Sequence, residues 1–171
     1  LIMHLVNITF SSLSILGLYL LTKEIFNKKI ALFSVLLTLF NPFFFGHMGM
    51  NSKDIIVFFS FIWFCYFFYL YCEKDEKILK NLILASFCVG FGCGVRLTFL
   101  IVIFPAVILG LIYLIKKIKS NYLTLAKRFS LHIPIVLLIT IFLVILCWPH
   151  FIVEIQKGNL IKFTSLIIKN T

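Results

Sequence analysis

The chain has 171 residues, of which 62% are hydrophobic and 21 are phenylalanine, and it carries a formal net charge of +10. A soluble domain of this length leaves much of its surface in water and could not bury so much apolar material. Most of the Lys and Arg residues fall in short stretches between apolar runs, without the interleaved aromatic residues on which bases stack, so the charge argues against nucleic-acid binding.

The apolar runs predict an all-α, polytopic membrane helical bundle with about six transmembrane helices, because a span needs about 20 apolar residues. We expect these spans at about residues 1–22, 30–45, 55–72, 82–95, 99–115 and 130–147. Pro42 marks a break or kink near the end of the second span, because proline lacks a backbone donor. The run of residues 81–115 is too long for one helix, and Arg96 interrupts it, which predicts a tight turn at residues 96–98.

The basic stretches predict the orientation of these spans. If residues 23–29, 74–80 and 116–128 are cytoplasmic, then residues 46–54, the Arg96 turn and everything after Trp148 share the opposite side. We therefore divide the chain into a transmembrane bundle at residues 1–150 and an amphipathic interfacial segment at residues 151–171. Leu1 already lies inside an apolar run, so we expect the chain to be a fragment of a longer protein.

The predicted polar loop at residues 46–54 holds adjacent charges at the start of the third span. A structural interpretation is sufficient: Asn51 or Ser52 caps the helix, Asp54 complements its dipole, and Lys53 reaches toward lipid phosphates. A functional interpretation is that the loop lines a pocket for an anionic headgroup. Lys53 would then bind the phosphate, and Asp54 would act as a base, a metal ligand or an orienting group.

Arg96 is the second unusual residue, because a lone arginine in an apolar run costs about 2.5 kcal/mol or more near mid-membrane. It either sits in water at the outer interface or has a function. Because Arg96 and Lys53 are predicted to face the same compartment, the two cations could converge on a phosphate, which arginine can hold with two parallel hydrogen bonds.

Small residues and histidines give weaker signals. The pair Gly90-x-x-x-Gly94 predicts a close helix contact rather than a nucleotide-binding loop, since no strand precedes it. His47 and His150 lie at the outer ends of spans, where they are solvated or could approach one another or a metal. The five cysteines lie in or beside apolar runs without metal-site spacing and are predicted to be small core residues.

The sequence from Asn41 to Ile55, Asn-Pro-Phe-Phe-Phe-Gly-His-Met-Gly-Met-Asn-Ser-Lys-Asp-Ile, resembles membrane glycosyltransferases of the protein O-mannosyltransferase and aminoarabinose transferase type, which have the GT-C fold. Two later segments occur in a similar order: Gly-x-Gly-Val-Arg at residues 92–96 and then Trp-Pro at residues 148–149. The chain departs from the family's pattern in having Ser52 where proline is common and Phe43 where arginine often follows the first proline.

The resemblance implies a hexosyl- or pentosyltransferase of a bacterial-type inner membrane. Such an enzyme moves a sugar from a polyprenyl-phosphate or dolichyl-phosphate donor to a lipid, protein or glycan acceptor on the non-cytoplasmic face. The family's main catalytic acid would lie upstream of residue 1, so the fragment alone is expected to be inactive. Asp54 would be a supporting catalytic residue, and the residues expected to bind the substrate are Lys53, Arg96, Asn51 and His47. The resemblance leaves the sugar and the need for a divalent metal open.

A non-enzymatic polytopic membrane protein, such as a transporter or a lipid flippase subunit, is the competing class. A transporter predicts paired broken helices and polar groups near mid-membrane. In this sequence the polar groups cluster at one predicted face, apart from a modest break at Pro105, which favours chemistry at the interface.

Overall fold

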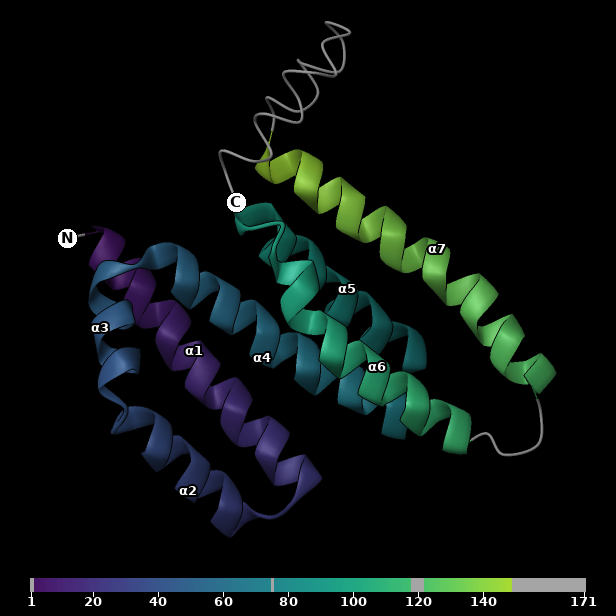
Figure 1. The fold of residues 1–171 in the computed structure, drawn as a ribbon, viewed down its shortest axis with the longest axis horizontal. Helices are drawn as coiled ribbons and strands as arrows, with labels where there is room; N and C mark the ends of the chain where they lie inside the picture. Colours follow the sequence, from purple (N-terminus) through teal and green to yellow (C-terminus); the bar gives the residue numbers. More distant parts are fainter. Residues whose placement is uncertain (1, 75, 118–121, 149–171) are drawn as a thin grey trace, which may run out of the picture.

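The computed structural model describes residues 2–74, 76–117 and 122–148, and for residues 2, 47–50, 52 and 122–129 it describes the backbone alone. All elements in these residues are α-helices, and none is a strand (Figure 1). They are α1 Ile2–Ile25, α2 Lys28–Leu39, α3 Pro42–Met50, α4 Ser52–Glu73, α5 Ile78–Val95, α6 Phe99–Lys117 and α7 Tyr122–Cys147. The predicted interfacial segment at residues 151–171 lies outside the described residues.

Within the described residues, five helices are long and apolar enough to cross a membrane. These candidate spans are Met3–Ile25, Lys53–Glu73, Ile78–Val95, Phe99–Lys117 and Ser130–Cys147. Large hydrophobic side chains on the outside of the bundle are exposed, for example Ile101 on α6 and Leu138 on α7. Lipid solvates such side chains, which water would not, so the structure confirms a polytopic helical membrane bundle.

The predicted second span, residues 30–45, is not one continuous helix. α2 has 12 residues and ends at Leu39, and α3 begins at Pro42. Proline disfavours a helical conformation in the residue before it, and Asn41 turns its side chain back so that Oδ1 accepts a hydrogen bond from the Phe43 N–H at 3.0 Å. α2 is therefore about 18 Å long, too short to cross a membrane alone. The two short helices together carry the chain from the end of α1 to the start of α4 (Figure 1).

The prediction of a polar loop at residues 46–54 is wrong, because most of these residues are helical. α3 continues to Met50 and α4 starts at Ser52, which leaves Asn51 as the junction between them. The Asn51 side chain accepts a hydrogen bond from the Asp54 N–H, which confirms Asn51 as the cap of the third predicted span. A polar sequence was mistaken for a loop because helix ends and loops share the same small and polar residues.

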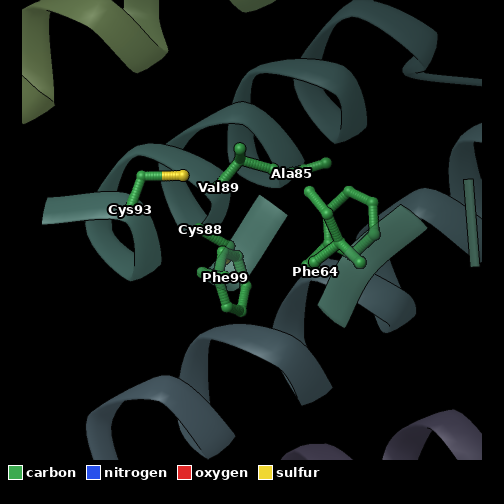
Figure 2. Packing of buried hydrophobic residues seen from close by; sticks show 7 residues of the cluster. Phe64, Ala85, Cys88, Val89, Cys93 and Phe99 are labelled. Carbon is green, nitrogen blue, oxygen red and sulfur yellow. The ribbon is translucent and has the colours of Figure 1, made fainter. Parts of the chain in front are cut away.

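α4 lies at the centre of the fold, in contact with α1, α5 and α6, and α7 packs on the other side of α5. A core cluster joins Phe64 of α4, Cys93 of α5 and Phe99 of α6 (Figure 2). Phe99 is completely buried against Gly92, whose missing side chain leaves room for the ring. This packing ties the α5–α6 turn to the core of the bundle.

The close contact predicted from the glycine pair is confirmed between α5 and α7. A Cβ atom on Gly90 would lie 2.7 Å from Leu143 Cδ1, and one on Gly94 would lie 2.6 Å from Cys147 Sγ. Small residues four apart let two membrane helices approach closely along one face. Cys72, Cys88 and Cys93 are buried as predicted, and Cys65 is half-buried. Cys147 is exposed, so the prediction of a core residue is wrong there.

Ion pairs show that the basic stretches gather at one end of the bundle. Lys74 Nζ lies 2.9 Å from Glu24 Oε2, and Lys117 Nζ lies 3.9 Å from Glu73 Oε2. Lys117 also donates to the Cys72 carbonyl at 3.1 Å, at the C-terminal end of α4. The ends of α1, α4 and α6 therefore meet, as the alternation of spans predicted. Which side of the membrane this end faces stays a prediction.

Candidate functional site

Asp54 lies in the first turn of α4, at the opposite end of the bundle from the basic stretches. Its neighbour Asn51 holds it from two directions. Asn51 Nδ2 donates to Asp54 Oδ2 at 2.6 Å, while Asn51 Oδ1 accepts from the Asp54 backbone N–H at 3.4 Å. The cap that starts the helix thus also fixes the orientation of the carboxylate.

Arg96 follows the last residue of α5 and has an extended backbone, with φ −147° and ψ 123°. The helix stops there and the chain turns through residues 96–98 into α6, as the sequence predicted. Arg96 Nη1 lies 2.9 Å from Asp54 Oδ1, and the two side chains are 35% and 31% exposed. Arg96 is therefore neither buried alone in an apolar run nor simply immersed in water: it is half-buried and paired with a carboxylate from another helix.

The structure unites three of the five predicted site residues, Asn51, Asp54 and Arg96. Lys53 precedes Asp54 on α4 and its side chain is exposed, while Arg96, from the turn after α5, forms an ion pair with Asp54. His47 lies in α3, and its side chain falls outside the described part of the chain. Asp54 therefore orients an arginine, a partner that the sequence analysis did not assign to it.

A pocket of about 460 Å³ opens beside this pair, where the break between α2 and α3 faces the start of α4. Its walls are mainly apolar, with polar groups from Thr38, Asn41 and Asp54. The apolar residues that line it are Leu37, Phe43, Phe44, Ile55 and Phe58. The sequence analysis expected a pocket lined by residues 46–54, and Asp54 of that stretch does line this one. The walls from α2 and α3 were not predicted, although the break at Asn41-Pro42 was the signal for them. A broken helix leaves space that a straight one would fill.

The described residues hold no group of three or more His, Cys, Asp or Glu side chains placed to bind a metal ion. What they do present is a carboxylate in the lining of a mainly apolar pocket, paired with a guanidinium from the turn after α5. A guanidinium has five N–H donors, so an arginine that gives one edge to a carboxylate can still donate to the oxygens of an anionic group. The arrangement suits a ligand that combines an anionic headgroup with an apolar chain.

The fold defines a polytopic integral membrane protein with an ion pair beside a mainly apolar pocket at one end of its helical bundle. The model of the dolichyl-phosphate-mannose-protein mannosyltransferase family matches residues 2–148, so the chain belongs to that family. No curated protein and no solved structure matches the chain. The family match confirms the resemblance found in the sequence, and it favours an enzyme over a transporter or a flippase subunit.

Proposed function

We propose that this chain forms part of an enzyme that transfers a sugar from a polyprenyl-phosphate donor to an acceptor on the non-cytoplasmic face of a bacterial-type inner membrane. The observation that carries the proposal is the contact between Arg96 and Asp54, a residue that lines the apolar pocket. The family match supports a membrane glycosyltransferase, and the identity of the donor is the proposed step beyond it.

The pocket supports a donor with a long hydrocarbon chain. Aromatic and aliphatic side chains from α2, α3 and α4 surround it, and Phe44 packs edge-on against Phe58 at a ring-centroid distance of 5.8 Å. Burial of apolar area in such a pocket yields roughly 25 cal/mol per Å² of surface withdrawn from water. An isoprenoid segment beside the Asp54 wall would place its phosphate near the Arg96 side chain.

In this proposal the two cations have different roles. Arg96 is held in place by Asp54 and binds the donor phosphate through N–H groups that do not face the carboxylate. Lys53, which is exposed on the first turn of α4, supplies a mobile second positive charge. Asp54 supports catalysis by fixing the direction of the guanidinium, so the phosphate meets an oriented donor rather than a freely rotating side chain.

The distribution of basic residues along the bundle supports a non-cytoplasmic active face. Basic residues concentrate on the cytoplasmic side of membrane proteins, and the ends of α1, α4 and α6 carry the basic stretches. The Asp54–Arg96 pair lies at the other end of the same helices. This placement supports transfer on the non-cytoplasmic face, where a lipid-linked donor is available and a soluble nucleotide-linked sugar is not.

The test is sugar transfer by the full-length protein in proteoliposomes, supplied with a polyprenyl-phosphate-linked sugar. Asp54→Asn and Lys53→Ala should each lower the rate while leaving expression unchanged. If Asp54 acts only on the dipole of α4, its substitution removes about 0.3–1 kcal/mol, too little to abolish transfer. Wild-type rates for both variants would refute the role of this site, and transfer from a nucleotide-linked sugar alone would refute the donor class.

A further inference from the structure

Two residues before Arg96, the C-terminus of α5 receives a hydrogen bond from the residue that follows α7. Trp148 Nε1 donates to the Gly94 carbonyl at 2.7 Å, across 54 residues of sequence. The last four carbonyls of a helix have no partner within the helix, and such groups are costly where water is scarce. The indole N–H therefore satisfies a carbonyl that a further turn of α5 would otherwise have used.

The approach of Trp148 depends on the small residues of α5. Gly94 lies directly against Cys147, the residue before Trp148, and Gly90 lies against Leu143 one turn earlier. Trp148 itself continues the hydrogen-bonding pattern of α7, with its N–H on the Val144 carbonyl at 3.0 Å. The ring is thereby placed on the end of α5 by a rigid helix rather than by a loop.

We propose that Trp148 is a positioning residue for Arg96: its hydrogen bond to Gly94 ends α5 at Val95 and directs the arginine toward Asp54. A helix that continued past Gly94 would rotate Arg96 by about 100° per residue around its axis. With the Gly94 carbonyl occupied, Arg96 leaves the helix in an extended conformation and its side chain reaches α4. Only the expected change in donor binding rests on the proposed function. The positioning of Arg96 against Asp54 does not depend on it.

The chain offers a matched control. Trp63 Nε1 donates to the Leu13 carbonyl at 3.2 Å, a bond of the same kind between α4 and α1, and neither residue lines the site. Trp148→Phe and Trp63→Phe therefore remove the same N–H group and keep an aromatic ring. A role in general stability would affect both variants alike, whereas a role in positioning Arg96 would affect only the first.

The experiment measures donor KM and kcat for sugar transfer by the full-length protein. Trp148→Phe should raise the donor KM roughly 2- to 10-fold, the effect of about one hydrogen bond, with kcat little changed. Trp63→Phe should leave both constants near wild type. In an Arg96→Gln background, Trp148→Phe should change KM less than about twofold, because the two residues act as a unit. Equal effects of the two tryptophan variants, or additive effects with Arg96→Gln, would overturn the proposal.

A second measurement separates this inference from the proposed function. Arg96→Gln should lower the thermal unfolding midpoint measured in detergent. The decrease should be smaller in the Trp148→Phe protein than in the wild-type and Trp63→Phe proteins. Equal losses in all three backgrounds would refute the positioning role, even in a protein that transfers sugar. If the wild type transfers no sugar from a lipid-linked donor but the losses differ as expected, the proposed function fails and the positioning role stands.

Discussion

Asp54 and Arg96 lie 42 positions apart in the chain, yet Asp54 Oδ1 and Arg96 Nη1 are 2.9 Å apart in the fold. The contact joins the first turn of α4 to the turn that follows α5, two points that an antiparallel helix pair places at the same end. Asp54 thus orients the Arg96 guanidinium before any ligand binds. We therefore expect specific effects from substitutions at this site and in the surrounding helices.

Substitution of Arg96 should impair sugar transfer in a graded way. Arg96→Lys keeps the charge but loses the planar pair of donors, so we expect the donor KM of the full-length protein to rise roughly tenfold, and further for Arg96→Gln. Both variants should insert normally, as judged by membrane fractionation. Equal kinetic constants for the wild type and both variants would show that Arg96 is a solvated interfacial residue with no role in transfer.

The ion pair between Glu24 and Lys74, at the other end of the bundle, should have no influence on transfer. Glu24 and Lys74 are also 2.9 Å apart, but they lie among the basic stretches, and the Lys74 side chain is 50% exposed. Glu24→Gln should therefore cost at most about 1 kcal/mol of stability and leave the transfer rate unchanged, in contrast to Asp54→Asn. A similar loss of rate in both variants would indicate general damage rather than a site.

The same pair predicts a dependence of stability on pH. The hydrogen bond to Glu24 raises the pKa of Lys74 above its ordinary value. A raised lysine pKa contributes stability that is fully present below the unfolded value of about 10.4 and is lost as the pH rises through the folded value. Thermal unfolding of the wild type and Lys74→Met should therefore differ at neutral pH and converge in strongly alkaline solution. A difference that persists there would contradict this assignment.

Gly90 should not tolerate even one additional methyl group. In Gly90→Ala the new Cβ would lie 2.7 Å from Leu143 Cδ1 and 3.2 Å from the Thr140 Cα atom, so α5 and α7 must separate, at a cost of about 1–3 kcal/mol. Gly46→Ala is the control, because no atom lies within 4 Å of its Cβ position and the change to alanine favours a helix equally. Thermal unfolding in detergent should show a loss for Gly90→Ala alone.

A bulky side chain in the pocket should compete with the donor. Thr38 lines the pocket from the end of α2, so Thr38→Phe should raise the donor KM severalfold in the full-length protein without a matching loss of stability. Leu36→Phe places the same ring on the same helix at a position that is 50% exposed and does not line the pocket. Unchanged kinetics for Thr38→Phe would show that the donor binds elsewhere.

The orientation of the bundle can be tested by labelling single cysteines with an impermeant thiol reagent in a background that lacks the five native cysteines. Cysteines at Gly49 and Thr98 should react from outside the cell, and cysteines at Lys28, Glu76 and Ser120 should react only after the membrane is opened. Labelling of positions 49 and 76 from the same side would overturn the proposed topology.

Much of the fold could be predicted from the sequence, because lipid-exposed helices are recognised by apolar runs of fixed length. The turn at Arg96 and the close contact at Gly90 and Gly94 were found for the same reason, since a lone charge and a spacing of four residues are local signals. The break between α2 and α3 was only half predicted. Pro42 indicated a kink, but hydropathy alone could not show that the helix stops at Leu39 and starts again.

The partner of Arg96 could not be predicted, because it depends on how two helices rotate about their own axes. The sequence placed Lys53, Asp54 and Arg96 at one end of the bundle and suggested that the two cations converge on a ligand. In the fold the carboxylate of Asp54, one residue further along α4, contacts the arginine. Successive side chains on a helix differ in direction by about 100°, and hydropathy does not determine the rotation of a helix about its axis to that accuracy.

α1 and α4 run in parallel, and their contacts recur at a nearly constant distance in the chain. Phe10 packs on Phe59 and Trp63 donates to the Leu13 carbonyl, pairs that are 49 and 50 positions apart. Each contact depends only on the faces of its own two helices, so a residue gained or lost between them would leave this packing intact. An insertion or deletion there would instead alter α2, the break at Asn41 or α3, which supply most of the pocket wall. In a diverging family, such length changes would alter the shape of the pocket while the surrounding scaffold is inherited unchanged.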